Sequence, residues 1–223
     1  MNIKSIIESA LNVFFPPKCG ICGKIGESYL CNKCKTLQAN LQINEYEMVC
    51  NKYFDETLFI YEYKDTIRDA IINYKFNDKS YISRTFALAM CDNNRVNEYI
   101  QNYDYIVPVP LSKQRLIKRG YNQVELIIKM YIKNKEKCNI IGVYNLIKKT
   151  EITPQSTLSK KERASNVIGA FSVNESSTYC FDTTKKILIV DDIYTTGSTI
   201  NECARVLKEF GFKEIGVLAI AKD

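Results

Sequence analysis

Apolar residues recur along the chain at two spacings, and these spacings predict strands and helices in turn. Short runs of β-branched, aromatic and other apolar residues predict strands at 57–63, 103–110, 139–147, 185–191 and 214–221. Apolar residues three and four positions apart predict helices at 65–76, 80–91, 122–133 and 198–211. Because strands that alternate with helices are typical of parallel sheets, we expect an α/β fold whose sheet carries helices on both faces.

The first 17 residues, MNIKSIIESALNVFFPP, carry an amphipathic pattern. Their apolar residues fall at helical spacing, with Lys4, Ser5 and Glu8 among the polar residues between them. A secretion signal would instead need a continuous apolar run and a small-residue cleavage site. We expect a helix that docks on the protein's own core; an interfacial membrane helix is the alternative. Since no stretch reaches the ~18 consecutive apolar residues of a transmembrane helix, we expect no membrane span and a cytoplasmic location.

Four of the nine cysteines lie in one short array, CGICGKIGESYLCNKC. Cys19 and Cys22 form one C-x-x-C pair, and Cys31 and Cys34 form a second. Each pair turns tightly enough to offer two thiolates to one ion, so the array fits a tetrahedral site with four cysteine ligands. We expect a structural zinc ion there; an iron–sulfur cluster and a redox-active pair are the alternatives. A disulfide framework is disfavoured, because the cytosol keeps thiols reduced.

The net charge of +6 is unevenly distributed. Residues 105–149 hold 10 Lys and Arg against 2 acids, whereas residues 41–104 hold 7 against 11. A basic middle segment attracts phosphates, or it forms a solvated helical face, and the composition leaves both interpretations open. The polar segment 153–166 contains Pro, Ser and Lys, and it predicts a loop or a short helix.

The stretch ILIVDDIYTTGST, residues 187–199, combines two adjacent acids with a loop rich in hydroxyl groups. Asp191 and Asp192 stand at the carboxyl end of a predicted strand, where parallel sheets bind ligands. Thr195–Thr199 then runs into the start of a predicted helix. Free backbone N–H groups, the helix dipole and hydroxyl groups meet there, and such a loop is suited to a phosphate. Gly197 allows the backbone to wrap closely around the anion.

Two carboxylates would repel a bare phosphate, so we expect them to bind another part of the same ligand. The hydroxyl groups of a sugar are suitable partners, because each carboxylate accepts hydrogen bonds. A 5-phosphorylated ribose carries both groups. The alternative is structural: Asp191 and Asp192 cap the next helix or loop.

The same stretch resembles the phosphoribosyl-pyrophosphate (PRPP) binding motif of type I phosphoribosyltransferases. Three further segments resemble the ComF-type competence proteins within that superfamily: FFPPKCGICG at the cysteine array, VPVPLSKQRLIKRGYNQVELI at 107–127, and PQSTLSKKERASNVIGAF at 154–171. The resemblance implies a type I phosphoribosyltransferase-like parallel sheet flanked by helices at 51–223. It also implies that residues 1–50 form an N-terminal helix and a small zinc-binding module with four cysteines.

The resemblance also implies roles for particular residues. Asp191 and Asp192 would bind the ribose hydroxyls and help to hold Mg²⁺, and the loop PVPLSK (108–113) would take the pyrophosphate with Lys113 as charge partner. The segment 159–166 would close over the substrate. The phosphate-binding residues would be Thr195, Thr196, Gly197, Ser198 and Thr199, and the basic supply would be extended by Arg115, Lys118 and Arg119.

The implied function is Mg²⁺-dependent phosphoribosyl transfer to an acceptor that the sequence does not identify. Relatives in the ComF-type group are linked to the import and handling of single-stranded DNA, together with a helicase partner. The alternatives are a non-catalytic adaptor that binds single-stranded DNA or the helicase, and a sensor that binds PRPP without turnover. A chain without histidine can still catalyse phosphoribosyl transfer, because the reaction mainly requires positioning and charge stabilisation.

Overall fold

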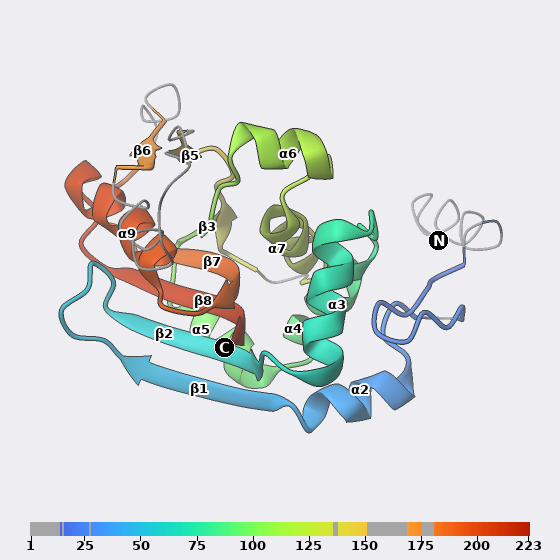
Figure 1. The fold of residues 1–223 in the computed structure, drawn as a ribbon. Coiled ribbons are helices and arrows are strands. Elements are labelled where there is room, and N and C mark those ends of the chain that lie inside the picture. Colours follow the sequence, from blue (N-terminus) through green and yellow to red (C-terminus); the bar gives the residue numbers. More distant parts are fainter. Residues whose placement is uncertain (1–13, 15, 27, 136–137, 151–168, 175–180) are drawn as a thin grey trace, which may run out of the picture.

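A central sheet with helices on both faces forms the body of the protein (Figure 1). The computed structural model describes residues 14, 16–26, 28–135, 138–150, 169–174 and 181–223. Within them, six strands are hydrogen-bonded in the order β1-β2-β8-β7-β3-β4, and only the pair β1–β2 is antiparallel. These strands are β1 Gln42–Met48, β2 Glu56–Glu62, β3 Tyr105–Pro108, β4 Ile141–Gly142, β7 Ile187–Tyr194 and β8 Ile215–Lys222.

The other described elements surround this sheet. The helices are α2 Asn32–Ala39, α3 Asp65–Phe76, α4 Ile82–Cys91, α5 Asn94–Gln101, α6 Lys113–Arg119, α7 Gln123–Asn134 and α9 Ser198–Phe210. A separate antiparallel hairpin pairs β5 Ile147–Lys149 with β6 Phe171–Val173.

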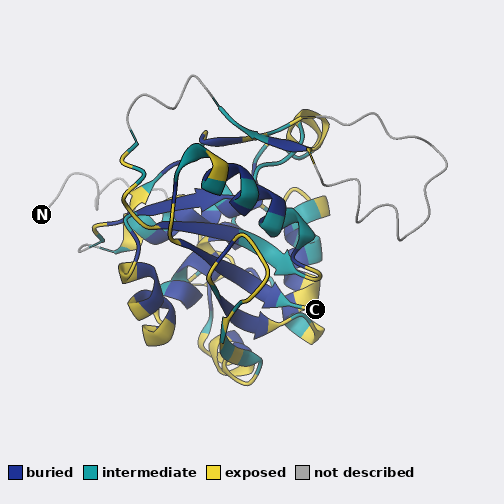
Figure 2. Cartoon of the chain, turned by 90° about the vertical axis from the view of Figure 1, so that its left-hand side faces the viewer, coloured by how far each residue is buried: buried dark blue, intermediate teal, exposed yellow. Residues whose placement is uncertain are grey.

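The sheet separates two hydrophobic clusters, and strand β7 contributes to both. Leu188 and Val190 pack into the cluster formed with α3, α4, α5 and α7, whereas Ile187 and Ile189 pack into the cluster formed with α9 and the hairpin. All four side chains are fully buried, as expected for an inner strand covered on both faces (Figure 2). The apolar sequence of β7 therefore reflects burial on two sides, and it fixes the position of the polar residues that follow.

Most of the predicted elements are confirmed. The helix at 65–76 has the predicted bounds, and the predicted helix at 198–211 is α9, which ends one residue earlier. The predicted strand at 139–147 is wrong as a single element. Two short strands, β4 and β5, replace it, because the chain turns between them and the apolar residues of the turn, Val143 and Leu146, are buried in the cluster formed with α9 and the hairpin.

Two predicted elements lie in segments that the structure does not describe. These are the N-terminal helix, of which residues 1–13 are not described, and the loop or short helix at 153–166. The boundary after residue 50 stays a prediction; β1, which precedes it, pairs with β2, which follows it. Among the described residues, no helix combines the length and the apolar character needed to cross a membrane.

Candidate functional site

The two acids of the motif lie on β7, directly after its four buried residues. The neighbouring strand β3 ends at Pro108, which pairs with Val190. Asp191 and Asp192 therefore stand just beyond the carboxyl end of β3, while β8 continues beside them as far as Lys222. Pairing with β8 also extends β7 to Tyr194, three residues past the predicted end of this strand. An edge of this kind is where open parallel sheets bind ligands.

The acids are close to positive charge. Lys75 from α3 places its Nζ atom 2.7 Å from Oδ1 of Asp192, and the two side chains are only 17% and 14% exposed. Asp191 accepts a hydrogen bond of 2.8 Å from the backbone N–H of Asp192. Burial, followed by the charge of Asp192, raises the pKa of the Asp191 carboxyl to about 7, while the charges of Lys75 and Lys149 act in the opposite direction. Near neutral pH, Asp191 can therefore donate as well as accept a proton in hydrogen bonds with a ligand.

The hydroxyl-rich loop forms one small concavity together with an acid. Asp191 and residues 193–200 line a cavity of about 50 Å³. Gly197 precedes the first residue of α9 and has a φ of 72°, a left-handed conformation that a glycine adopts without strain. A Cβ atom at this position would lie 2.6 Å from Cζ of Tyr194. Thr196 Oγ1 and Ser198 Oγ are hydrogen-bonded at 2.8 Å, so the hydroxyl groups are held together above the start of α9.

The loop is supported by Lys52, which lies between β1 and β2. Its Nζ atom donates to the Tyr194 hydroxyl at 2.5 Å and to the Thr196 carbonyl at 3.5 Å. Nearby, the backbone N–H of Tyr53 donates to the Asn201 side chain at 2.9 Å. Sequence reasoning did not identify Lys52 or Lys75, because each approaches the motif from more than 100 positions away in the chain. No local pattern around either lysine signals these contacts.

Helix α6 carries the predicted pyrophosphate partner. Lys113 is its first residue, and the preceding Ser112 caps the helix by accepting a hydrogen bond from the Arg115 N–H. Lys113 is exposed, and so the structure places it on the surface of α6 rather than against the acids. Arg119, at the end of the same helix, is close enough to Asp192 for that charge to raise its pKa, although burial has the larger effect and lowers it. The role of Lys113 stays a prediction.

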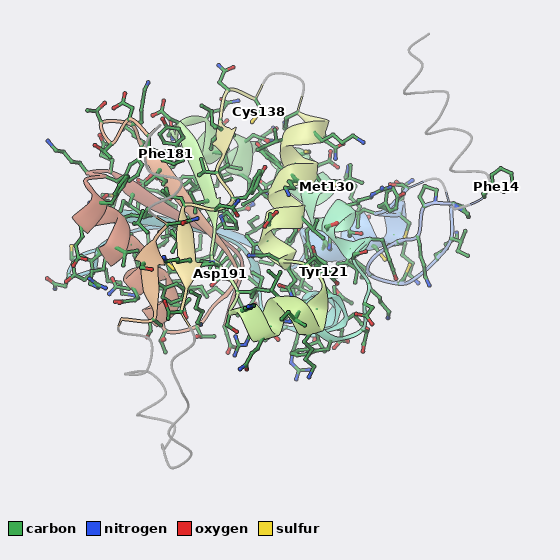
Figure 3. All side chains as sticks on the ribbon, turned by 90° about the horizontal axis from the view of Figure 1, so that it is seen from above. Phe14, Tyr121, Met130, Cys138, Phe181 and Asp191 are labelled. Carbon is green, nitrogen blue, oxygen red and sulfur yellow. The ribbon has the colours of Figure 1, made fainter. Side chains whose placement is uncertain are left out.

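The segment predicted to close over the substrate, 159–166, lies outside the described residues. Hydrogen bonds hold the residues that flank this segment. The Thr150 N–H donates to the Ala170 carbonyl at 2.9 Å, and the Gly169 N–H donates to Glu202 of α9 at 2.6 Å. The first bond closes one end of the hairpin β5–β6, and the second holds that end beside α9, the helix that begins at the hydroxyl-rich loop. Seen from above, Asp191 lies near the middle of the molecule, with Tyr121 on the side of α6 and α7 (Figure 3).

The four cysteines of the array come together as predicted. The Sγ atoms of Cys19, Cys22, Cys31 and Cys34 all lie within 4.8 Å of one another, and those of Cys22 and Cys31 are 3.7 Å apart. A tetrahedral ion with bonds of about 2.3 Å to sulfur requires sulfurs about 3.8 Å apart, so the cluster fits a zinc-sized ion. It could therefore hold a metal ion.

Local backbone geometry explains why the thiols converge. Gly23 has a φ of 74° and donates its N–H to the Cys19 carbonyl at 2.9 Å, which closes the first C-x-x-C turn. Cys31 precedes α2, and Cys34 lies in the first turn of that helix. Burial acts to raise the pKa of the Cys19 thiol, but backbone hydrogen bonds from Cys22, Cys31 and Ile21 outweigh it and lower this pKa to about 7. The thiolate that a metal requires is thus favoured at Cys19.

The cysteine module is attached to the body through α4. The Gly20 N–H donates to the Thr85 hydroxyl at 3.1 Å, and that hydroxyl donates to the Tyr29 carbonyl at 2.5 Å. A side chain at Gly20 would collide with Thr85, so the close approach requires a glycine. Lys35 of α2 forms an ion pair of 2.6 Å with Asp92 after α4.

Comparison with known proteins relates both parts of this arrangement to one group. The phosphoribosyl transferase domain family matches residues 159–223, which include β7, the hydroxyl-rich loop, α9 and β8. Competence protein F of Haemophilus influenzae is 30% identical over 213 residues, which cover 92% of this chain and 85% of that protein.

Two other similar proteins extend over most of the chain. Competence protein ComFC of Streptococcus pneumoniae is 26% identical over 200 residues, which cover 89% of this chain and 83% of that protein. DNA utilization protein YhgH of Escherichia coli is 25% identical over 214 residues, which cover 91% of this chain and 90% of that protein. The similarity thus includes the cysteine module as well as the sheet.

Proposed function

Since the chain belongs to the competence protein F family, we propose that it is a phosphoribosyltransferase-like protein that binds PRPP or a related ribose 5-phosphate ligand with Mg²⁺ and acts in DNA uptake. The observation that carries this proposal is that Asp191 and the loop 195–199 line the same cavity. A group that binds sugar hydroxyls and a group that binds phosphate are therefore available to one small ligand. The proposed location is the cytoplasm.

The proposed roles follow from the two sides of that cavity. Backbone N–H groups and hydroxyls of Thr195, Thr196, Gly197, Ser198 and Thr199 hold the 5-phosphate at the start of α9. Asp191 and Asp192 accept hydrogen bonds from the ribose hydroxyls. Lys75 offsets the charge of Asp192, so an anionic ligand approaches a site whose acids are largely neutralised.

Transfer of the phosphoribosyl group passes through a state with positive charge on the ribose and negative charge on the departing pyrophosphate. When bound, Mg²⁺ would stabilise the charge on the pyrophosphate. The residues of this chain orient the ribose and keep its anomeric carbon accessible, and no histidine or protein nucleophile is required. We assign Lys113 as the charge partner of the pyrophosphate. We assign Asp191 and Asp192 as the residues that position the reacting ribose.

We assign a structural zinc ion to the cysteine cluster. Four thiolates close the coordination shell, so no position is open for catalysis. The ion would hold α2 and the first C-x-x-C turn together, and the module docks on α4 through Thr85.

Catalysis is tested by incubating the protein with PRPP, Mg²⁺ and each common purine or pyrimidine base and measuring pyrophosphate release. Transfer predicts release with at least one base, and loss of release in the Asp192→Asn variant. If PRPP binds but no base yields pyrophosphate, the protein is a PRPP-binding protein without transferase activity. Release that continues unchanged in Asp192→Asn would contradict the assigned site.

A non-catalytic adaptor that binds single-stranded DNA or a helicase is the second candidate. It is favoured by α6, none of whose residues is buried and which carries four cationic residues, Lys113, Arg115, Lys118 and Arg119. Binding to an oligonucleotide over a salt series tests it, because contacts with DNA phosphates weaken steeply as salt rises. Absence of binding at low salt excludes direct DNA contact, and a pull-down with the helicase then tests the partner role.

A further inference from the structure

A lysine from outside the motif contacts the hydroxyl-rich loop. Lys52, in the connection between β1 and β2, donates from its Nζ atom to the Tyr194 hydroxyl at 2.5 Å and to the Thr196 carbonyl at 3.5 Å. Tyr194 and Thr196 both line the cavity that Asp191 also lines. The ammonium group of Lys52 therefore lies at the edge of the proposed phosphate site.

The connection between β1 and β2 runs along α9 towards the start of this helix. Asp55 forms an ion pair of 3.2 Å with Lys208, near the end of α9. Two residues earlier in the connection, the Tyr53 N–H donates to the Asn201 side chain at 2.9 Å, in the first turn of α9. The backbone itself thus brings Lys52 to the helix start, so the position of the cation does not depend on its long side chain alone.

The groups that hold Lys52 are neutral. Its Nζ atom lies 5.2 Å from the centroid of the Tyr194 ring and 5.3 Å from that of the Phe54 ring, both within the range of cation–π contacts. No acid among the described residues forms an ion pair with Lys52; Glu47, the last acid of β1, pairs with Lys222 at 2.8 Å. Since an ammonium group has three donors and two of them are used, one donor remains for an anion.

The loop itself contains no cation. Residues 195–199 offer hydroxyl and backbone N–H groups, and Lys75 is already paired with Asp192. A phosphate monoester carries a charge of about −1.5 to −2 at neutral pH, whereas the start of a helix offers only about +0.5. A phosphate in the loop would therefore benefit from a cation at the edge of the cavity.

We propose that Lys52 binds the 5′-phosphate of the ligand directly, as the cation that the loop 195–199 lacks. This inference rests on the proposed function and adds a residue that binds the ligand. The phosphate would then be held between the start of α9 and the connection that precedes β2. Because Lys52 is exposed, salt screens this contact.

The test measures the affinity for ribose 5-phosphate by calorimetry. Lys52→Met binds about tenfold more weakly than the parent protein, the lower end of the range for a charge-assisted hydrogen bond, because the lysine is exposed. Lys52→Arg keeps the charge and restores most of this affinity. Lys213→Met is the matched control, because it removes the same charge from an exposed lysine just before β8, at the opposite end of the parallel strands from the loop.

A salt series separates contact with the phosphate from support of the loop. Salt weakens an exposed charge–charge contact, so the difference in affinity between the parent and Lys52→Met shrinks between about 20 mM and about 500 mM sodium chloride. If Lys52 only holds Tyr194 in place, the two proteins differ by the same factor throughout this range, because the contacts of Lys52 with Tyr194 involve no second charge.

The outcomes separate this inference from the function on which it rests. If the parent binds ribose 5-phosphate and a folded Lys52→Met, checked by circular dichroism, binds it equally well, Lys52 does not bind the phosphate and the ribose phosphate site stands. A loss that is independent of salt leads to the same conclusion. If the parent does not bind ribose 5-phosphate at millimolar concentration, both the inference and the proposed function are overturned.

Discussion

Replacing Asp191 by Asn separates the stability of the protein from its proposed function. The carboxyl of Asp191 lies beside Asp192 and is desolvated, so its ionised form is unfavourable in the folded state. Asparagine has nearly the same shape, and its Oδ1 atom can accept the hydrogen bond that the Asp192 N–H now donates at 2.8 Å. The substitution therefore removes a charge while it preserves the local hydrogen bond.

The size of the effect follows from the pKa of Asp191, which rises from 3.8 to about 7 on folding. A carboxyl group with a raised pKa contributes stability below its unfolded value, and this contribution is lost as the pH rises through the folded value. At about 1.4 kcal/mol for each pKa unit, the raised pKa of this desolvated group lowers the stability of the folded state by about 4 kcal/mol at pH 8 and by about 2 kcal/mol at pH 5, where folding requires the uptake of a proton. Asp191→Asn avoids this cost, so it stabilises the fold and does so more strongly at pH 8.

Urea denaturation at pH 5 and pH 8 measures the two values of the free energy of unfolding. We expect the variant to be more stable than the parent at both pH values, with a gain larger by about 2 kcal/mol at pH 8, and to bind ribose 5-phosphate more weakly. Glu98→Gln is the control, because Glu98 is an exposed acid of α5 outside the site. A variant that is equally stable or less stable at pH 8 would show that Asp191 is not an energetically costly group kept for ligand binding.

Three further predictions concern the loop, its cation and the cysteine module. Gly197→Ala costs about 1–2 kcal/mol of folding stability because of the positive φ at this position. The added Cβ also displaces the Tyr194 ring, so we expect calorimetry to show that ribose 5-phosphate binds at least tenfold more weakly. Unchanged binding would contradict the role of the loop. Lys75→Met leaves the largely buried Asp192 carboxylate without its cation; urea denaturation should show a loss of about 2–4 kcal/mol, and unchanged stability would contradict the role of this ion pair. We expect metal analysis of the purified protein to find one zinc ion per chain. Cys34→Ser or a strong chelator should remove this ion and lower the melting temperature. A zinc-free protein of unchanged stability would exclude a structural metal.

The sequence predicted those parts of the fold that depend on local patterns. The apolar runs of β7 and β8 are buried on both faces, and so they are recognisable without knowledge of their neighbours. The helix at 65–76 has its predicted bounds because its apolar residues recur at helical spacing within one continuous segment. The two C-x-x-C pairs converge because each is closed by a turn within a few residues, so the spacing alone was sufficient to predict the cluster.

Features that depend on packing between distant segments were not predictable. The contacts of Lys75 with Asp192 and of Lys52 with Tyr194 join residues separated by 117 and 142 positions, and no periodicity describes such contacts. The apolar stretch at 139–147 was wrongly interpreted as one strand, because a buried turn and a strand have similar composition. Helix α6 was not predicted, because none of its residues is buried and it therefore lacks the apolar face by which helices are recognised.

Titration of PRPP into the protein in the presence of Mg²⁺, followed by calorimetry, is the direct test of the proposed ligand site. In the proposed site, the acids of β7 and the loop at the start of α9 bind one ribose 5-phosphate ligand. We predict saturable binding at a single site per chain, and its loss in the double variant Asp191→Asn, Asp192→Asn, whose fold is checked by circular dichroism. If the parent protein does not bind PRPP, or if the double variant binds it equally strongly, Asp191 and Asp192 do not form a PRPP site.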